Sequence, residues 1–262
     1  MLQTQINPIR VPAGKNKILQ QALVQINANE EIATLWQVIN VNAIERLGMS
    51  DHGPVHFQIV ANIALKLLRT LQKKGVIPSV VKDFNLTQEH AELIIVLASI
   101  LHDLGMSINR DGHEEFSLIL TNSLLREILT FLPINERTIV ISETLHAIIN
   151  HRAGGRPITL EGGIVRVADA LDMSQGRSRI PFEAGKIDIY SLSAFSIDKV
   201  EIKEGIDKPV LIEIFMNNSA GIFQIDELLK SKLRDSGIEP YLEIIGHIES
   251  ESEKRLLTEF KL

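Results

Sequence analysis

Apolar residues recur every three or four positions through most of the first 173 residues, the spacing that buries one face of an α-helix. The run from Val55 to Leu71 follows this spacing, and Asp51-His52-Gly53-Pro54 ahead of it is typical of a helix start, because proline is favoured at the first helical position. The same pattern predicts helices over about 18–26, 32–48, 54–71, 87–104, 111–131, 135–151 and 160–173.

The predicted helix that begins at Thr87 differs from the others because it is apolar on nearly every side. A helix of this kind is surrounded by other helices, so we expect it at the centre of the fold. Gly105 is expected to end it, since glycine is the residue most often found just past a helix C-terminus.

The period changes after Pro181, where apolar residues begin to alternate with polar ones, as in half-buried strands. Two strands separated by the Asp207-Lys208-Pro209 turn, then a helix, then a third strand give the order β-β-α-β. The predicted fold class is therefore mainly α, a helical bundle with a small C-terminal α+β domain. We expect an N-terminal helical segment (1–50) packed on the body, a helical domain (51–182) and the α+β domain (183–262).

Composition narrows the class of protein. The 262 residues carry a net charge of −6, which argues against binding nucleic acid by bulk charge, and 45% of them are hydrophobic, which excludes a disordered chain. The chain has no cysteine, so disulfides, thiolate metal sites and cysteine nucleophiles are excluded. Without a signal-peptide pattern or an apolar run of ~20 residues, we expect a soluble cytoplasmic protein that contacts no membrane.

Histidines are concentrated in one part of the chain: seven of the eight lie between positions 52 and 151. His102-Asp103 ends the most apolar predicted helix, where burial and the helix dipole both disfavour a carboxylate. A divalent cation bound by both side chains would remove these penalties. The alternative is that Asp103 faces solvent and His102 is a hydrogen-bonded core histidine.

Asp169 interrupts another apolar helix, and small alanines flank it, so a metal could approach closely. A surface ion pair with Arg166, three residues earlier, is the alternative. His56 falls in the first turn of its helix. His52 precedes that turn, near the positive end of the helix dipole, where it can either bind phosphate oxygens or serve as an ordinary cap-region residue.

Three further histidines are candidate ligands. His113 opens a helix, and His151 precedes a basic turn that contains Arg152 and Arg156. His146 lies about 140° round the same helix from His151, so both cannot point squarely at one metal. Of these two, His151 is favoured.

Taken together, these residues resemble the HD-domain superfamily of metal-dependent phosphohydrolases. His56-Phe57-Gln58-Ile59-Val60-Ala61 is similar to the first motif of that family, Leu101-His102-Asp103-Leu104-Gly105 to the second, and Val167-Ala168-Asp169-Ala170-Leu171-Asp172 to the last. The resemblance covers roughly residues 51 to 180. Met106 stands where the family has a lysine or a similar polar residue, so that auxiliary role is unassigned.

The resemblance implies that His56, His102, Asp103 and Asp169 bind one divalent ion, and that His113 and His151, with His146 as the weaker candidate, bind a second. Imidazole and carboxylate ligands favour manganese, iron or zinc, with magnesium possible. The implied reaction is hydrolysis of a phosphoester, of a nucleotide or a related small phosphate, by metal-activated water, with Asp103 and His52 as catalytic residues. The substrate phosphate would be bound by His52, Arg152, Arg156, Arg177 and Arg179.

Two other functions stay open at this point. Some relatives of this helical scaffold hold two irons and oxidise an organic substrate with O₂. A non-catalytic nucleotide sensor is the other alternative, in which the α+β domain passes on a signal. The three expected strands leave sheet edges that a second copy could cover, so we also expect a homodimer. No Gly-rich phosphate loop, zinc-protease helix motif or serine-hydrolase elbow occurs in the chain.

Overall fold

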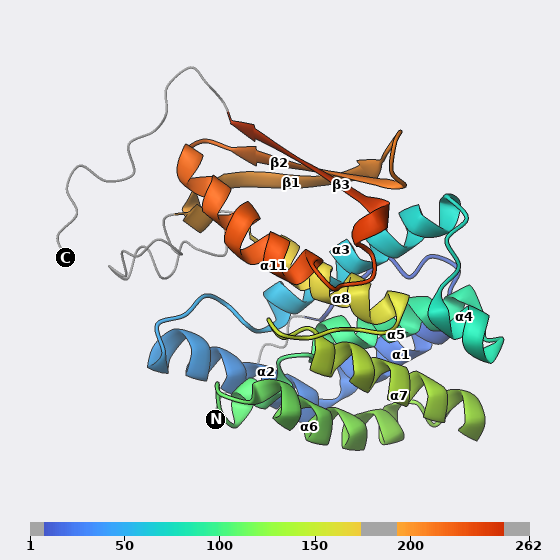
Figure 1. The fold of residues 1–262 in the computed structure, drawn as a ribbon. Helices are drawn as coiled ribbons and strands as arrows, with labels where there is room; N and C mark the ends of the chain where they lie inside the picture. Colours follow the sequence, from blue (N-terminus) through green and yellow to red (C-terminus); the bar gives the residue numbers. More distant parts are fainter. Residues whose placement is uncertain (1–7, 174–192, 249–262) are drawn as a thin grey trace.

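A computed structural model describes residues 8–173 and 193–248 of the chain. A helical body lies below a three-stranded sheet, and α11 runs between them (Figure 1). The predicted mainly α fold with a small α+β part is confirmed. The elements are α1 (Lys17–Ala28), α2 (Glu30–Asn40), the π-helix η1 (Val41–Arg46), α3 (Pro54–Lys73), α4 (Ser79–Phe84), α5 (Gln88–Leu101), the 3₁₀-helix η2 (Leu104–Ser107), α6 (His113–Ile128), α7 (Ile134–Asn150), α8 (Leu160–Leu171), β1 (Ile197–Glu204), β2 (Val210–Met216), η3 (Ser219–Gly221), the π-helix η4 (Gln224–Leu229), α11 (Lys230–Leu233), η5 (Glu239–Tyr241) and β3 (Leu242–Ile248).

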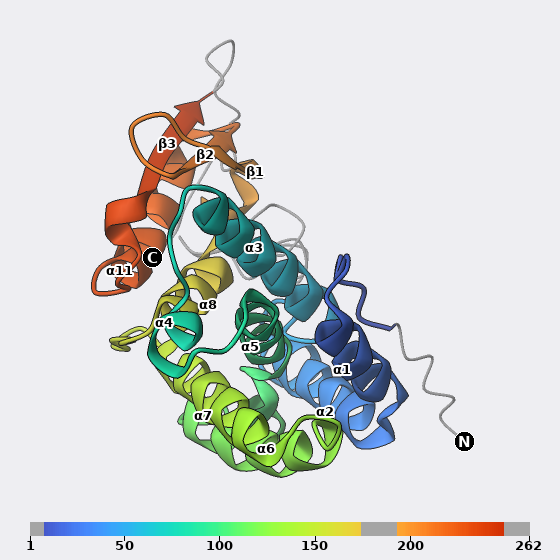
Figure 2. The ribbon, with the colours of Figure 1, turned by 90° about the vertical axis from the view of Figure 1, so that its right-hand side faces the viewer.

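Helix α5 is the centre of the body, as predicted. The other helices of the body surround it (Figure 2), and almost all of its residues are buried. Thr87 caps its N-terminus, and His90 closes the capping box. The segment Gln88–Ser107 is long and apolar enough to cross a membrane, but 94% of its most apolar stretch is buried inside the fold. Its hydropathy is therefore that of a core helix.

Gly105 has a different role from the one predicted. Helix α5 ends at Leu101, and Gly105 lies inside the next element, η2. A Cβ atom at this position would sit only 1.9 Å from the carbonyl oxygen of His113. Glycine is required here because η2 and the start of α6 pack backbone against backbone, which brings His113 close to the end of α5.

The N-terminal helices pack on the centre of the body. Helices α1 and α2 bury one apolar face each, and Trp36 donates its indole N–H to the carbonyl of Ile100 at 3.2 Å. Asn42 donates to the carbonyl of Met106 at 2.8 Å. These two bonds fix the chain on either side of His102 and Asp103.

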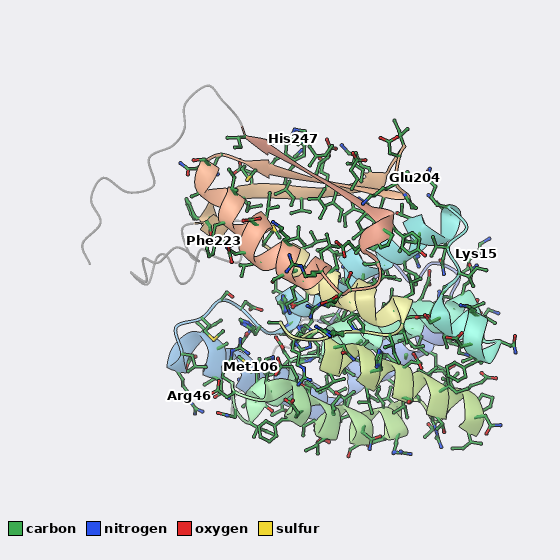
Figure 3. All side chains as sticks on the ribbon, viewed as in Figure 1. Lys15, Arg46, Met106, Glu204, Phe223 and His247 are labelled. Carbon is green, nitrogen blue, oxygen red and sulfur yellow. The ribbon has the colours of Figure 1, made fainter. Side chains whose placement is uncertain are left out.

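The C-terminal unit (residues 193–248) is a small mixed sheet with one helical cover. β2 is central, pairs antiparallel with β1 and parallel with β3, and places Ile212 between Ile202 and Ile244. Parallel pairing of β2 and β3 requires a crossover, which η4 and α11 supply. His247 lies on the outer face of the sheet (Figure 3), away from α11. The homodimer expected from the sheet edges and the division into domains stay predictions.

Arg166 joins this unit to the body. Its side chain is 1% exposed and donates to the carbonyls of Arg152 and Ala153 after α7 and of Ser231 and Lys232 in α11. The alternative expectation, a surface ion pair between Arg166 and Asp169, is therefore wrong, because the guanidinium is buried and donates to these backbone oxygens. The contact brings α11 against the turn that follows His151.

Glu161 provides a test of the packing of the body. Its buried carboxylate accepts the backbone N–H groups of Ser79 and Val80 at 3.2 and 3.0 Å, and burial raises its pKa. We expect Glu161→Ala to lower the free energy of unfolding by about 2 to 3 kcal/mol, because two buried donors lose their acceptor. Chemical denaturation measures this change, and Glu127→Ala, on the exposed face of α6, should change it by less than about 0.5 kcal/mol. Equal effects of the two substitutions would contradict this account.

Candidate metal centre

Six side chains from five parts of the helical body meet in one buried cluster. α3 supplies one histidine, the end of α5 supplies the His-Asp pair, and α6, α7 and α8 supply the rest. The cluster consists of His56, His102, Asp103, His113, His151 and Asp169. The structure thus brings together all six residues that the sequence favoured as metal ligands.

Four members form the first half of the cluster. The Nε2 atoms of His56 and His102 are 3.2 Å apart, and Oδ1 of Asp169 lies 3.5 and 3.7 Å from them. Oδ2 of Asp103 is 3.4 Å from Nε2 of His102 and 4.0 Å from that of His56. The ligand atoms of His56, His102 and Asp169 lie close enough together to hold one metal ion, and Oδ2 of Asp103 is beside them.

The second half of the cluster consists of His113 and His151 and shares Asp103 with the first half. Its other oxygen, Oδ1, lies 3.2 Å from Nε2 of His113 and 3.6 Å from Nε2 of His151. The Glu114 carboxylate is near the same pair and can offer a further ligand atom. Asp103 therefore has one oxygen facing each half, so it could offer a ligand atom to an ion in either half.

Oxygen atoms behind three of the histidines determine which ring nitrogen carries a hydrogen. Nδ1 of His102 contacts the carbonyl of Ser99 at 2.9 Å, Nδ1 of His151 contacts that of Ile148 at 2.6 Å, and Nδ1 of His56 contacts Asp172 at 2.6 Å. Oxygens of these kinds accept, so each Nδ1 carries a hydrogen, and Nε2 is the ring nitrogen that can offer a lone pair to a metal in the cluster. Two lone pairs 3.2 Å apart, as between His56 and His102, are stable when a cation lies between them.

The charges of the cluster also fit a divalent metal ion. Burial alone would raise the pKa of Asp103, but His102 and His113 hold it well below the usual value. The pKa of Asp169 is also well below the usual value, because Lys232 and His56 outweigh burial. Burial, with the charges of His102 and Lys232, lowers the pKa of His151 to about 3. At neutral pH the cluster therefore presents ionised carboxylates and a neutral His151, which fit divalent metal.

His146 lies apart from the cluster. Its Nε2 accepts the backbone N–H of Ile158 at 3.1 Å, which turns the ring toward the loop after α7. His151, at the end of the same helix, points into the cluster instead. The geometry thus favours His151, as the helical spacing did.

Three of the other predicted site residues, His52, Arg152 and Arg156, lie within the described part of the chain. The buried His52 ring has its centroid 5.7 Å from that of His56, and its Nδ1 contacts the carbonyl of Ser50 at 2.8 Å. Arg152 and Arg156 are exposed and pair with Glu115 at 2.8 Å and Asp235 at 3.6 Å. Arg177 and Arg179 lie outside the described residues.

Sequence reasoning assigned no role to two residues that contact the ligands directly. Asp172 stands in the last motif, and its Oδ2 lies 2.6 Å from Nδ1 of His56. Lys232, in α11, donates to Oδ2 of Asp169 at 3.2 Å. A carboxylate one helical turn beyond Asp169 is a signal that could have indicated Asp172, whereas nothing in the sequence around Lys232 indicates its position.

Asp172 should orient His56 and strengthen it as a ligand. We expect Asp172→Asn to weaken metal binding by about 10- to 100-fold, the usual effect of removing a carboxylate behind a ligating histidine. Titration of the metal-free protein with manganese measures the dissociation constant. Asp83→Asn, at an exposed site on α4, is the control and should bind as the unmodified chain does. Unchanged affinity in Asp172→Asn would show that Asp172 does not support the ligand.

Comparisons with known proteins agree with this geometry. The HD domain family matches residues 55–174, which contain every member of the cluster. An uncharacterized protein of Methanocaldococcus jannaschii is 42% identical to this chain over 239 residues, which is 91% of each sequence. Because so much of the chain is matched, the similarity extends beyond the helical body into the C-terminal unit.

Proposed function

Because the chain belongs to the HD-domain superfamily of metal-dependent phosphohydrolases, we propose that it hydrolyses a phosphoester of a small, nucleotide-like molecule with metal-activated water. The observation that carries this proposal is the position of Asp103, whose two oxygens face two sets of histidine Nε2 atoms. A buried cluster of this composition has no use in packing alone, since burying two ionised carboxylates is costly without cations.

The residues fit one or two divalent ions. His56, His102, Asp169 and Oδ2 of Asp103 would hold the first, and His113, His151 and Oδ1 of Asp103 the second. The mixture of imidazole and carboxylate favours manganese, iron or zinc over magnesium. Such ions supply Lewis acidity, which lowers the pKa of water and neutralises charge on a phosphoester.

The surrounding residues would prepare this chemistry. Asp103 faces both halves of the cluster, and the backbone carbonyls behind His102 and His151 hold a hydrogen on Nδ1 and keep the rings aligned. The His52 ring lies 5.7 Å from that of His56, centroid to centroid, and we propose that it contacts a substrate phosphate and moves a proton at its ring nitrogen. Substrate binding by Arg152 and Arg156 stays a prediction, because both side chains pair with surface carboxylates in this structure.

Metal analysis followed by a phosphatase screen tests the proposal. The purified chain, loaded with manganese or zinc, is assayed without O₂ on nucleotides, cyclic nucleotides and sugar phosphates. We expect release of phosphate or of a nucleotide, and the same preparation of Asp103→Asn should release none, which excludes a contaminating phosphatase. Turnover that needs O₂ would contradict hydrolysis and favour the oxygenase, and metal binding without turnover would favour the sensor.

A further inference from the structure

Lys232 lies at the junction of the C-terminal unit and the metal cluster. Its ammonium group donates to Oδ2 of Asp169 at 3.2 Å and to the carbonyl of His151. Among the described lysines and arginines, it alone has a charged nitrogen within 4.0 Å of a carboxylate of the cluster. Met106, labelled in Figure 3, is an apolar side chain only 1% exposed, and the guanidinium of Arg110, in the same segment, contacts the His113 ring at 2.8 Å.

The two oxygens of Asp169 have separate neighbours. Oδ1 faces Nε2 of His56 and of His102, where the first ion would be held, whereas Oδ2 faces Lys232. Lys232 and a metal therefore need not compete for the same oxygen. The ion pair would instead keep Asp169 turned with Oδ1 toward the metal position.

The ammonium group has capacity left for a third partner. A lysine has three N–H donors, and Asp169 and His151 accept two of them. Within residues 8–173 and 193–248 no acceptor takes the third, and the side chain is 18% exposed. An anionic oxygen bound beside the metal position could accept this hydrogen.

Buried contacts hold Lys232 in place. Arg166, in α8, donates to the carbonyl of Lys232 at 2.7 Å and to that of Ser231 at 3.1 Å. The same guanidinium holds the carbonyl of Ala153, in the turn after His151, at 2.9 Å. A fixed backbone on both sides gives the lysine a defined position, which a phosphate-binding group requires.

We propose that Lys232 binds a phosphoryl oxygen of the substrate, so that the C-terminal unit completes the active site. This inference rests on the proposed function. Lysine is well suited to the role, because its compact charge binds phosphate without a fixed planar geometry. The C-terminal unit would thus contribute the positively charged ammonium group of Lys232 to phosphate binding, in addition to packing on the body.

Phosphate binding by the manganese-loaded chain, freed of excess metal, tests the proposal by calorimetry with inorganic phosphate as the probe. We expect Lys232→Gln, which keeps a donor for the His151 carbonyl but removes the charge, to bind phosphate at least about tenfold more weakly at unchanged metal content. Lys232→Arg should restore most of the affinity. Lys230→Gln is the matched control, two residues away and 62% exposed, and should bind as the unmodified chain does.

Other outcomes would overturn the inference. Equal phosphate affinity in Lys232→Gln and the unmodified chain would show that the lysine only supports packing. The same conclusion would follow if a loss of metal or of thermal stability in Lys232→Gln accounted for all of its weaker phosphate binding. A loaded, unmodified chain that binds no phosphate would overturn it as well. Tight, Lys232-dependent phosphate binding without turnover of any phosphoester would overturn the proposed hydrolysis and leave only the phosphate-binding role of Lys232 standing.

Discussion

Asp103→Asn is expected to remove both metal ions and to lower phosphoesterase activity by at least about a thousandfold. The substitution removes the single carboxylate that faces both halves of the cluster, with His102 on one side and His113 on the other. A bound ion stabilises the transition state by several kcal/mol, and each 1.36 kcal/mol corresponds to a factor of ten in rate. Elemental analysis and the rate on the best phosphoester measure the two effects on one preparation.

The control for this substitution is Asp207→Asn. Asp207 is exposed in the hairpin between β1 and β2, so the same change of charge there should leave metal content and rate unchanged. Full metal content in Asp103→Asn would remove Asp103 from the ligand set. Loss of metal without loss of activity would separate the reaction from the cluster altogether.

Local features of the sequence single out the candidate ligands, whereas their assignment to one metal-binding set comes from the resemblance to the HD-domain family. His56 lies in the first turn of α3, which Pro54 begins, and His102 and Asp103 follow the last turn of the most apolar helix. Helix ends are marked by short-range signals, and in a bundle the ends of neighbouring helices lie close together. The predicted histidines at helix ends therefore meet in the folded chain.

The contacts around the ligands depend on packing that no short-range signal records. Asp172 reaches His56 across 116 residues of sequence, and Lys232 reaches Asp169 across 63. Gly105 was expected to end a helix, since glycine often does, but its need for a bare backbone comes from the approach of His113. Such roles depend on which elements pack together, and a single sequence does not specify that.

Replacing one histidine of the second half of the cluster should reduce the metal content from two ions to one. In His113→Ala or His151→Ala, the donors of the first half, His56, His102 and Asp169 with Oδ2 of Asp103, are all retained. The first ion should therefore stay bound while the second is lost. Activity should fall by about 100-fold or more, because a single ion would not stabilise both the attacking and the leaving oxygen. Manganese content per chain, measured after loading and removal of excess metal, gives the count.

His146→Ala provides the matched control on the same helix as His151. Its ring accepts from Ile158 and has no place in the cluster, so both ions should remain and activity should be close to that of the unmodified chain. If the unmodified chain binds only one ion and His113→Ala keeps it, the site is mononuclear. In that case Asp103 would ligate through Oδ2 alone, and His113 and His151 would serve only to hold its other oxygen in place.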